Sequence, residues 1–374
     1  MQKKAYSIIF TAFLLICFNT EAQEREINSL EIGAKAPDFD LPGIDGINYS
    51  LNDFDDYQVL FVVFWSNHCP TAQAYEDRMI AMVSKYRPKG VGFVAISPNS
   101  PVALSLSELG YSDLGVDFDD MVIRATVKAY NFPYLYDGDT HDGSVPYGPV
   151  ATPHVFIFDH DRLLRYSGRI DDTENPYEES GTSEAKDAIE ALLKDREVAV
   201  KETPLSGCPI KWKWNDQWSR ELEKEWTEMP VTIDTINIKG IKNLITNNSE
   251  NLRLINLWAT WCDPSIREFP ELVNIYRMYR GRDFEFISIN TDNLSKKNTV
   301  LRSLKSHEAA NKNYLYSASD KYALIEAVDK NWQGALPHSL LIAPGGEIIR
   351  RYAGVINPLT VKQDIVDYLG RYFD

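Results

Sequence analysis

Two cysteines stand at the ends of apolar runs, in a position where a thiol can take part in redox chemistry. The run before Cys69 reads FVVFWSNH, and the run before Cys262 reads LINLWATW. A strand that passes through a short turn into a helix would place each sulfur at the helix N-terminus. There, unpaired backbone N–H groups and a partial positive charge favour the thiolate. Because the thiolate is the reactive form of cysteine, the sequence indicates two thiol redox sites.

Neither site has the second cysteine that would close a disulfide within its own turn. The first turn reads S-x-x-C, from Ser66 to Cys69, and the second reads C-x-x-S, from Cys262 to Ser265. A serine can donate a hydrogen bond to a thiolate, and we expect Ser265 to do so, but it cannot attack a mixed disulfide. A C-x-x-S site therefore waits for an external thiol to release its partner. The pattern favours monothiol exchange that depends on an external thiol reductant.

Cys208 lies far along the chain from both turns, in the segment SGCPIKWKW. Three interpretations are open: a resolving cysteine that returns to Cys69, a static brace, or a free thiol. A link to Cys69 requires the two Cα atoms to come within about 7 Å of each other. Of the three interpretations we favour pairing with Cys69.

The N-terminus has the pattern of an export signal. Lys3 and Lys4 precede the apolar run 8–18, and Thr20-Glu21-Ala22 provides small residues for cleavage after Ala22. We therefore predict a signal peptide over residues 1–22 and a periplasmic, oxidising location in which disulfides persist. The run is too short to span a bilayer, so we expect no membrane span after cleavage. An uncleaved membrane anchor is the alternative.

The net charge and the spacing of the cysteines exclude several classes of partner and cofactor. The formal net charge of −15 repels phosphate backbones, so we expect no nucleic-acid partner. The sequence has neither C-x-x-C nor C-x-x-C-H spacing and no glycine-rich phosphate loop. We therefore expect no metal and no cofactor.

The two halves of the chain repeat one order of elements. Each half has a cysteine at a strand-to-helix turn, then a distant Pro-His, at Pro153 and Pro337, and then Arg-Tyr-x-Gly. The apolar runs predict strands over residues 59–65, 91–97, 151–159, 252–259, 283–289 and 335–343. The last segment of each half predicts a helix, over 183–193 and 359–372. Strands that alternate with helices favour an α/β fold with a partly parallel sheet.

These motifs resemble a known superfamily. Both halves are similar to thioredoxin-fold domains, which implies an α/β fold of two tandem domains, each a central mixed β-sheet flanked by helices. The first half resembles the redoxin, or AhpC/TSA peroxiredoxin-like, group through IGAKAPDFDLPGIDG, SNHCP, TPHVFIFD and GCPIKW. The second half resembles TlpA-like thiol–disulfide oxidoreductases through WATWCDPSIREFPEL, in which Ser265 replaces a cysteine. We expect a signal peptide over 1–22, a redoxin domain over 28–213, a linker helix over 214–228 and a TlpA-like domain over 229–374.

The resemblance implies how substrates bind. In this superfamily a cis-proline packs against the reactive sulfur, which matches Pro153 and Pro337. The residue before each proline, Thr152 or Leu336, would pair with a bound peptide as an added strand. The apolar Leu336 would make the second groove the more apolar of the two.

The resemblance also assigns acid–base and peroxide roles. Glu268 matches the active-site glutamate of the TlpA-like group and would relay protons; the alternative is a solvated helix residue. Cys69 and Ser66 match the peroxide-attacking cysteine of peroxiredoxins and the hydroxyl residue before it. Peroxide attack needs a cationic group, for which Arg124 and Arg169 are candidates. We expect His68 to face solvent.

The leading functional prediction is an exported thiol oxidoreductase with an antioxidant or redox-homeostasis role. Cys262 would exchange with thiols and disulfides of proteins or small molecules, and the first half would use Cys69 with or without Cys208. One alternative is a peptide-binding module whose thiols are vestigial. Another is a thiol peroxidase that uses Cys69 with Cys208 as the resolving thiol.

Overall fold

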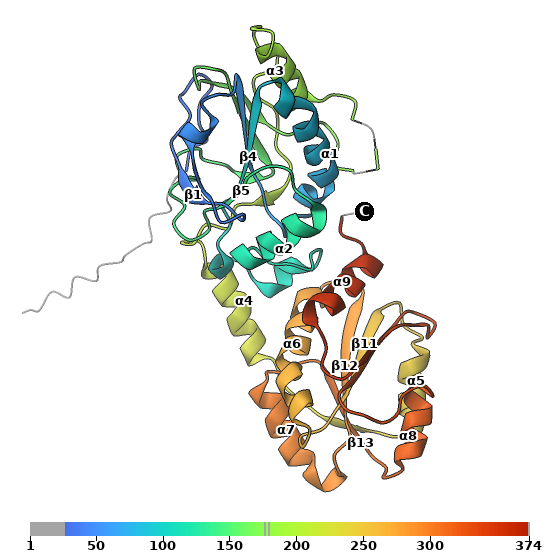
Figure 1. The fold of residues 1–374 in the computed structure, drawn as a ribbon. Coiled ribbons are helices and arrows are strands. Elements are labelled where there is room, and N and C mark those ends of the chain that lie inside the picture. Colours follow the sequence, from blue (N-terminus) through green and yellow to red (C-terminus); the bar gives the residue numbers. More distant parts are fainter. Residues whose placement is uncertain (1–26, 176, 179, 373–374) are drawn as a thin grey trace, which may run out of the picture.

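A computed structural model describes residues 27–372 apart from 176 and 179, and its two α/β halves are connected by helix α4, Gln217–Glu228 (Figure 1). Each half has a central mixed sheet flanked by helices, as the resemblance implied. The predicted signal peptide lies outside the described residues. Within the described residues, no helix has both the length and the apolar character needed to cross a bilayer.

The sheet of the first half has five strands in the order β5-β4-β3-β7-β8. The strands are β3 (Val59–Phe64), β4 (Val91–Ser97), β5 (Tyr134–Tyr136), β7 (His154–Phe158) and β8 (Leu164–Gly168). The pairs β3–β4 and β4–β5 are parallel, whereas β3–β7 and β7–β8 are antiparallel. Two short antiparallel strand pairs lie outside this sheet: β1 (Asp40–Pro42) with β2 (Asn48–Ser50), and β6 (Ala151–Thr152) with β9 (Cys208–Pro209).

The sheet of the second half has six strands in the order β10-β13-β12-β11-β14-β15. The strands are β10 (Asp234–Ile236), β11 (Leu252–Trp258), β12 (Phe284–Asn290), β13 (Lys312–Tyr316), β14 (His338–Ile342) and β15 (Ile348–Ala353). The first four strands in the spatial order run parallel, and β14 and β15 pair antiparallel at the end of the sheet. The same strand-to-helix order therefore precedes both cysteines: β3 leads to Cys69, and β11 leads to Cys262.

Helices cover the two sheets. Those of the first half are α1 (Pro70–Tyr86), α2 (Phe118–Lys128) and α3 (Glu184–Leu192). Those of the second half are α5 (Ile238–Thr246), α6 (Asp263–Tyr279), α7 (Lys297–Ser306), α8 (Lys321–Val328) and α9 (Pro358–Leu369). Two short 3-10 turns, η3 (Pro101–Ala103) and η4 (Leu106–Leu109), lie in the first half where it faces α4 and α6.

The central strands are apolar throughout because both of their faces are buried. Along β3, Val59, Phe61 and Val63 enter the core cluster beneath α1, α2 and α3. The alternate residues of β3 enter a second cluster on the opposite face, together with the β1–β2 region. Side chains alternate between the faces of a strand, so a strand covered on both sides has no polar face to show. In the sequence such strands therefore occur as continuous apolar runs.

Several predicted boundaries differ from the structure for local reasons. The run 151–159 is divided into β6 and β7 by Pro153, and the run 335–343 yields a strand only after Pro337, from His338. A proline cannot donate a ladder hydrogen bond, which interrupts the pairing. The last helix was expected to reach residue 372 but ends at Leu369, because Gly370 adopts a φ of 88° beyond its end.

Candidate thiol redox sites

Cys69 is positioned by the strand β3 and the helix α1. It is the N-cap residue of α1, directly before Pro70, with the extended backbone that an N-cap requires. The side chain is completely buried, with 0% of its surface exposed. The sulfur therefore lies at the positive end of a 17-residue helix, as the sequence predicted, but it is not open to solvent.

The cis-proline predicted beside this sulfur is present. The Thr152–Pro153 bond is cis, and the Cys69 thiol donates a hydrogen bond of 3.0 Å to the Thr152 carbonyl oxygen. Cys208 also reaches this place, because β9 pairs antiparallel with β6 and sets Cys208 directly opposite Thr152. The structure thus brings together Cys69, Thr152, Pro153 and Cys208. The two cysteines are free thiols.

The Cys208 side chain packs against the core cluster that contains Cys69. Burial alone would raise the pKa of Cys69, but hydrogen bonds from the Cys208 thiol and from the backbone N–H of Ala72 outweigh it. The pKa of Cys69 is lowered to about 7. The same hydrogen bond, together with burial, raises the pKa of Cys208. Of the two thiols, Cys69 is therefore the one that loses its proton first as the pH rises.

Ser66 and His68 are turned toward each other rather than toward Cys69. The Ser66 hydroxyl and His68 Nδ1 are hydrogen-bonded at 2.6 Å. The expectation that His68 faces solvent is wrong, because its side chain is buried. Burial, with a smaller contribution from Lys211, lowers the pKa of His68 to about 3. The imidazole is therefore neutral near pH 7 and provides no positive charge for a thiolate.

The two arginines considered for peroxide chemistry are engaged elsewhere. Arg124 pairs with Glu76 at 2.6 Å and is itself buried, and Arg169 pairs with Glu184 at 2.5 Å. Each guanidinium group is thus held by a carboxylate. The geometry gives no support to the cationic partner that peroxide attack at Cys69 would require.

The second site has the same arrangement around Cys262. This residue is the N-cap of α6 and directly precedes the helix, and 8% of its surface is exposed. The Leu336–Pro337 bond is cis, and Cys262 Sγ lies 3.6 Å from the Leu336 carbonyl oxygen. In the described part of the chain no strand pairs with Leu336. The neighbouring Trp261 is exposed, so an apolar side chain lies at the surface next to Cys262.

Ser265 occupies the place of the missing second cysteine but does not make the contact expected of it. Its side chain is fully buried, one turn into α6. The Ser265 hydroxyl has no hydrogen-bond partner among the described residues, so the predicted hydrogen bond to Cys262 is absent. In this arrangement Ser265 is a buried residue of the helix that makes no polar contact with the Cys262 thiol.

Glu268 is buried, so the alternative of a solvated helix residue is wrong. It is 3% exposed, accepts a hydrogen bond of 3.0 Å from Asn256 Nδ2, and accepts one of 2.9 Å from the backbone N–H of Ile356. Burial outweighs these hydrogen bonds and raises the pKa of Glu268 to about 7. A carboxyl group with this pKa can both give and take a proton near neutral pH. Asn256 was not predicted as a site residue; its signal in the sequence is a polar residue in the middle of an apolar strand.

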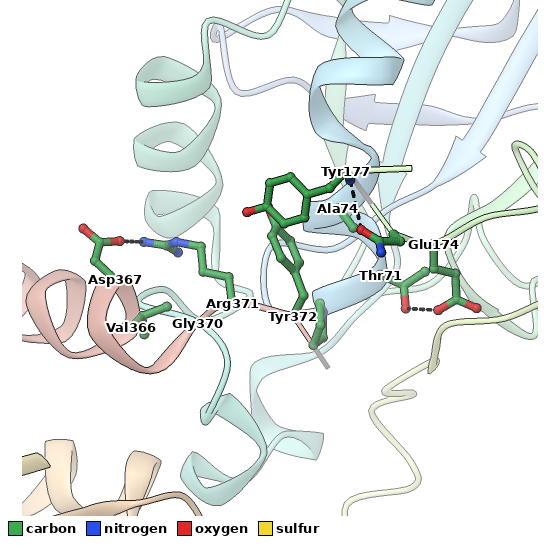
Figure 2. Close-up of a pocket in the computed structure, with 11 residues that line it drawn as sticks. Thr71, Ala74, Glu174, Tyr177, Val366, Asp367, Gly370, Arg371 and Tyr372 are labelled. Carbon is green, nitrogen blue, oxygen red and sulfur yellow. Dashed lines mark hydrogen bonds and ion pairs between the residues drawn. The ribbon is translucent and has the colours of Figure 1, made fainter. Parts of the chain in front are cut away.

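A cleft of about 700 Å³ lies between the start of α1 and the end of the chain (Figure 2). On one side Thr71 donates a hydrogen bond to Glu174, and on the other side Arg371 pairs with Asp367 at 3.3 Å. The rings of Tyr177 and Tyr372 meet edge to face across the cleft. The cleft begins one residue beyond Cys69, but it does not expose that sulfur.

Comparison with known proteins places each half in a family. The AhpC/TSA family model matches residues 32–167, and the Redoxin family model matches residues 243–367. The chain belongs to the thioredoxin superfamily. The superfamily fold explains why each half of the chain carries a cysteine at a helix start beside a cis-proline.

Individual members of the thioredoxin superfamily resemble parts of the chain. "Thiol-disulfide oxidoreductase ResA" of Bacillus subtilis is 26% identical over 27% of this chain, and the match spans about half, 52%, of that relative. "Thiol:disulfide interchange protein DsbE" of Allochromatium vinosum is 24% identical over 42% of this chain and 78% of that protein. A solved structure of an uncharacterised conserved protein from Geobacillus kaustophilus is 32% identical, covers 50% of this chain and 95% of its own, and has a TM-score of 0.44.

Proposed function

We propose that the protein catalyses thiol–disulfide exchange, with Cys262 as the nucleophile of the second half. The observation that carries the proposal is the position of Cys262, at the start of α6 beside the cis Leu336–Pro337 bond, with no strand of the described chain in the groove. The matches to proteins named thiol–disulfide oxidoreductase and interchange protein support it. The substrates are disulfides and thiols of proteins or small molecules.

The exchange proceeds in two displacements. The Cys262 thiolate attacks one sulfur of a disulfide, so that a mixed disulfide forms and the other sulfur leaves as a thiolate. An external thiol then attacks the mixed disulfide, because Ser265 has no sulfur with which to do so. The thiolate that leaves takes up a proton, and Glu268, with a pKa of about 7, supplies or accepts protons in the region of α6.

The exposed surface beside Cys262 favours an extended peptide as substrate. Trp261 and Val355 are exposed apolar side chains, and Val355 follows Gly354, whose N–H donates to the Pro337 carbonyl. A peptide that adds a strand at Leu336 would lie between them.

We further propose that residues 1–22 direct export, and that the chain is organised as domains 28–213 and 229–374 on either side of the linker 214–228.

The test uses a chain in which Cys17, Cys69 and Cys208 are all replaced by serine, so that Cys262 is the one remaining thiol. At pH 7 the thiol is expected to react with iodoacetamide about tenfold faster than free cysteine, and to form a mixed disulfide with a disulfide-bonded peptide. Cys262→Ser in the same chain is the control. An alkylation rate of Cys262 equal to that of free cysteine would contradict the proposal.

A peptide-binding module is the competing function, and the same pair of variants separates the two. Under the exchange mechanism, disulfide-linked complexes depend on Cys262 and disappear in Cys262→Ser. A pure binding module would retain equal affinity for the peptide in both variants and give no linked complex in either. Equilibrium binding and non-reducing electrophoresis measure the two quantities.

A further inference from the structure

The peptide groove of the first half is occupied by the chain itself. Strand β9 pairs antiparallel with β6 at Thr152, which precedes the cis-proline. A peptide that adds a strand to this fold would pair at the same backbone position. The fit is close: a Cβ atom on Gly207 would lie 2.1 Å from the Thr152 carbonyl oxygen. β9 therefore takes the place of a substrate strand, and Cys208 takes the place of the substrate's cysteine.

Contacts on both sides of β9 hold it in the groove without help from the sulfurs. Before β9, the Thr203 N–H donates to the Ser167 carbonyl at 3.2 Å. After it, the Lys211 N–H donates to Asn99 Oδ1 at 2.8 Å, and the Lys211 carbonyl accepts from the Ser100 N–H at 2.8 Å. Lys211 also forms an ion pair with Glu108. Because these contacts are independent of the thiols, the strand belongs to the fold and does not require a disulfide to stay in place.

The two sulfurs are unequally accessible. Cys69 is fully buried beneath β9, whereas Cys208 is partly exposed. Cys208 lies directly opposite Thr152, whose carbonyl oxygen is 3.0 Å from Cys69 Sγ, so the two cysteines are neighbours on either side of this residue. A reagent from solution therefore meets Cys208 before it meets Cys69.

We propose that Cys69 and Cys208 form a reversible disulfide that exchanges with low-molecular-weight thiols at Cys208, and that β9 excludes protein segments from this groove. The inference deepens the proposed function, on which it rests, by assigning the halves different substrate classes. The first half exchanges with small thiols and disulfides. The second half, with its open groove at Leu336, accepts peptides.

The chemistry of the first half balances with a small disulfide as oxidant. When the pair is oxidised, one cysteine attacks the small disulfide and releases one small thiol. The other cysteine then attacks the mixed disulfide and releases the second, so two electrons and two protons pass to the small molecule. In reduction a small thiolate attacks Cys208, and Cys69 leaves as a thiolate at the N-terminus of α1. A second thiol frees Cys208 as a small disulfide is formed.

The first experiment follows the pair alone. Replacing Cys17 and Cys262 by serine leaves Cys69 and Cys208 as the thiols of the chain. In glutathione buffers of increasing oxidation, mass spectrometry after alkylation should show both thiols lost together in one step. During reduction of the oxidised protein by glutathione, an acid quench should trap the adduct on Cys208. Two thiols that stay reduced in excess glutathione disulfide, or an adduct on Cys69, would contradict the proposal.

The second experiment tests the strand. Gly207→Ala forces β9 away from Thr152, so alkylation of Cys69 in the reduced chain should accelerate by about tenfold. Gly281→Ala is the matched control, because a Cβ there meets nothing within 4 Å. Lys211→Met, which removes the ion pair with Glu108, is the milder second variant and should accelerate alkylation in the same direction. If Gly207→Ala and Lys211→Met both alkylate at the rate of the Gly281→Ala control, β9 does not protect the Cys69 sulfur.

Failure of the proposed Cys69–Cys208 disulfide can be distinguished from failure of the proposed exchange at Cys262. The Cys262 test is performed in a chain without Cys69 and Cys208, and the pair is tested in a chain without Cys262. An inactive Cys262 leaves the disulfide measurement intact, and an absent disulfide leaves the Cys262 measurement intact. Circular dichroism of Cys208→Ser, whose strand keeps its other contacts, checks that loss of the pair is not loss of the fold.

Discussion

At the scale of single residues, Ser265 occupies the position that decides whether the second half has one thiol or two. The side chain is fully buried in the first turn of α6, three positions after Cys262, and its hydroxyl has no hydrogen-bond partner in the described chain. A cysteine at this position would stand where the second sulfur of a C-x-x-C turn stands. One atom therefore separates a monothiol site from a dithiol site.

Under the proposed exchange mechanism, placing a sulfur there should change how a mixed disulfide at Cys262 is released. In Ser265→Cys, we expect a disulfide between positions 262 and 265, and release of a mixed disulfide about tenfold faster without added thiol, because an internal thiol replaces an external one. Quenched-flow mass spectrometry of the mixed disulfide gives the rate. Ser306→Cys, an exposed serine on α7, adds a thiol outside the turn and serves as the control. Equal release rates in the two variants would show that the geometry of the turn does not support a dithiol.

Glu268 makes the stability of the second half depend on pH. Burial raises its pKa from 4.5 to about 7, so the folded state holds a proton that the unfolded chain has already lost. The free energy of unfolding therefore falls as the pH rises from about 4.5 to about 7. Between pH 5 and pH 8 this group should remove roughly 2 to 3 kcal/mol of stability.

Urea unfolding at pH 5 and pH 8 measures this effect. Glu268→Gln has no proton to lose, so the difference in stability between the two pH values should shrink by that amount relative to the unmodified chain. The matched control is Glu271→Gln, an exposed glutamate one turn further along α6, which should leave the difference unchanged. The assignment fails if both variants keep the same pH dependence.

Some residues of the sites were readable from the sequence and others were not. Cys69, Cys262 and the two prolines carry local signals, because a strand, a turn and a helix start follow one another within a few residues. The pairing of Cys208 with Cys69 has no local signal, since it depends on a strand of two residues crossing to Thr152. The burial of His68 was missed because a polar triplet after a strand usually marks a solvated turn, whereas here the side chain is buried and hydrogen-bonded to Ser66.

At the scale of elements, α1 is fixed by a buried ion pair to α2. Glu76 on α1 accepts hydrogen bonds from Arg124 at 2.6 and 2.8 Å and from the Tyr130 hydroxyl at 2.7 Å. Both charged side chains are almost completely buried. Removing one partner of such a pair leaves the other charge buried without compensation. The start of α1, which holds Cys69, therefore depends on this contact for its position.

We expect Glu76→Gln to destabilise the protein by about 3 to 5 kcal/mol, since Arg124 stays charged and loses the nearest negative charge. Chemical denaturation measures the loss. The neighbouring Asp77 lies on the exposed side of the same helix, so Asp77→Asn should change stability by less than about 0.5 kcal/mol. Equal effects of the two substitutions would mean that the pair is not a determinant of the α1–α2 contact.

The strands that the sequence predicted are those buried on both faces. Runs such as 91–97 and 252–258 became β4 and β11 because a two-sided core demands apolar residues throughout. The short edge strands β5 and β10 were missed, since three-residue strands at the edge of a sheet carry little pattern. The region 238–246 was also missed, although α5 has a clear apolar stripe, because the helix is only nine residues long and Ile241 is its one fully buried residue.

At the scale of the whole molecule, the two halves share buried surface beyond the helix that links them. Leu109 of η4, in the first half, enters the core cluster formed by α6 and α9 of the second half. The Tyr279 hydroxyl donates to the Ser112 carbonyl at 2.8 Å, and Arg371 pairs with Asp113 at 2.5 Å. These contacts join the second half to the first close to the start of α1. The segment that ends at Tyr372 accordingly lies beside the start of α1. Figure 1 shows α9, which leads into this segment, on the side of the second half that faces the first.

This shared core predicts that the halves unfold together and that one side chain can separate them. Leu109→Ala removes a buried side chain from a cluster to which both halves contribute, at a cost of about 2 to 5 kcal/mol. We expect calorimetry to resolve two thermal transitions in this variant where the unmodified chain shows one, because the penalty falls on the contact between the halves. Limited proteolysis should then cut faster within α4. Leu294→Ala, at a position that is 44% exposed, is the matched control and should keep a single transition. A single, uniformly shifted transition in Leu109→Ala would instead mean that helix α4 and the remaining polar contacts are enough to make the two halves unfold as one unit.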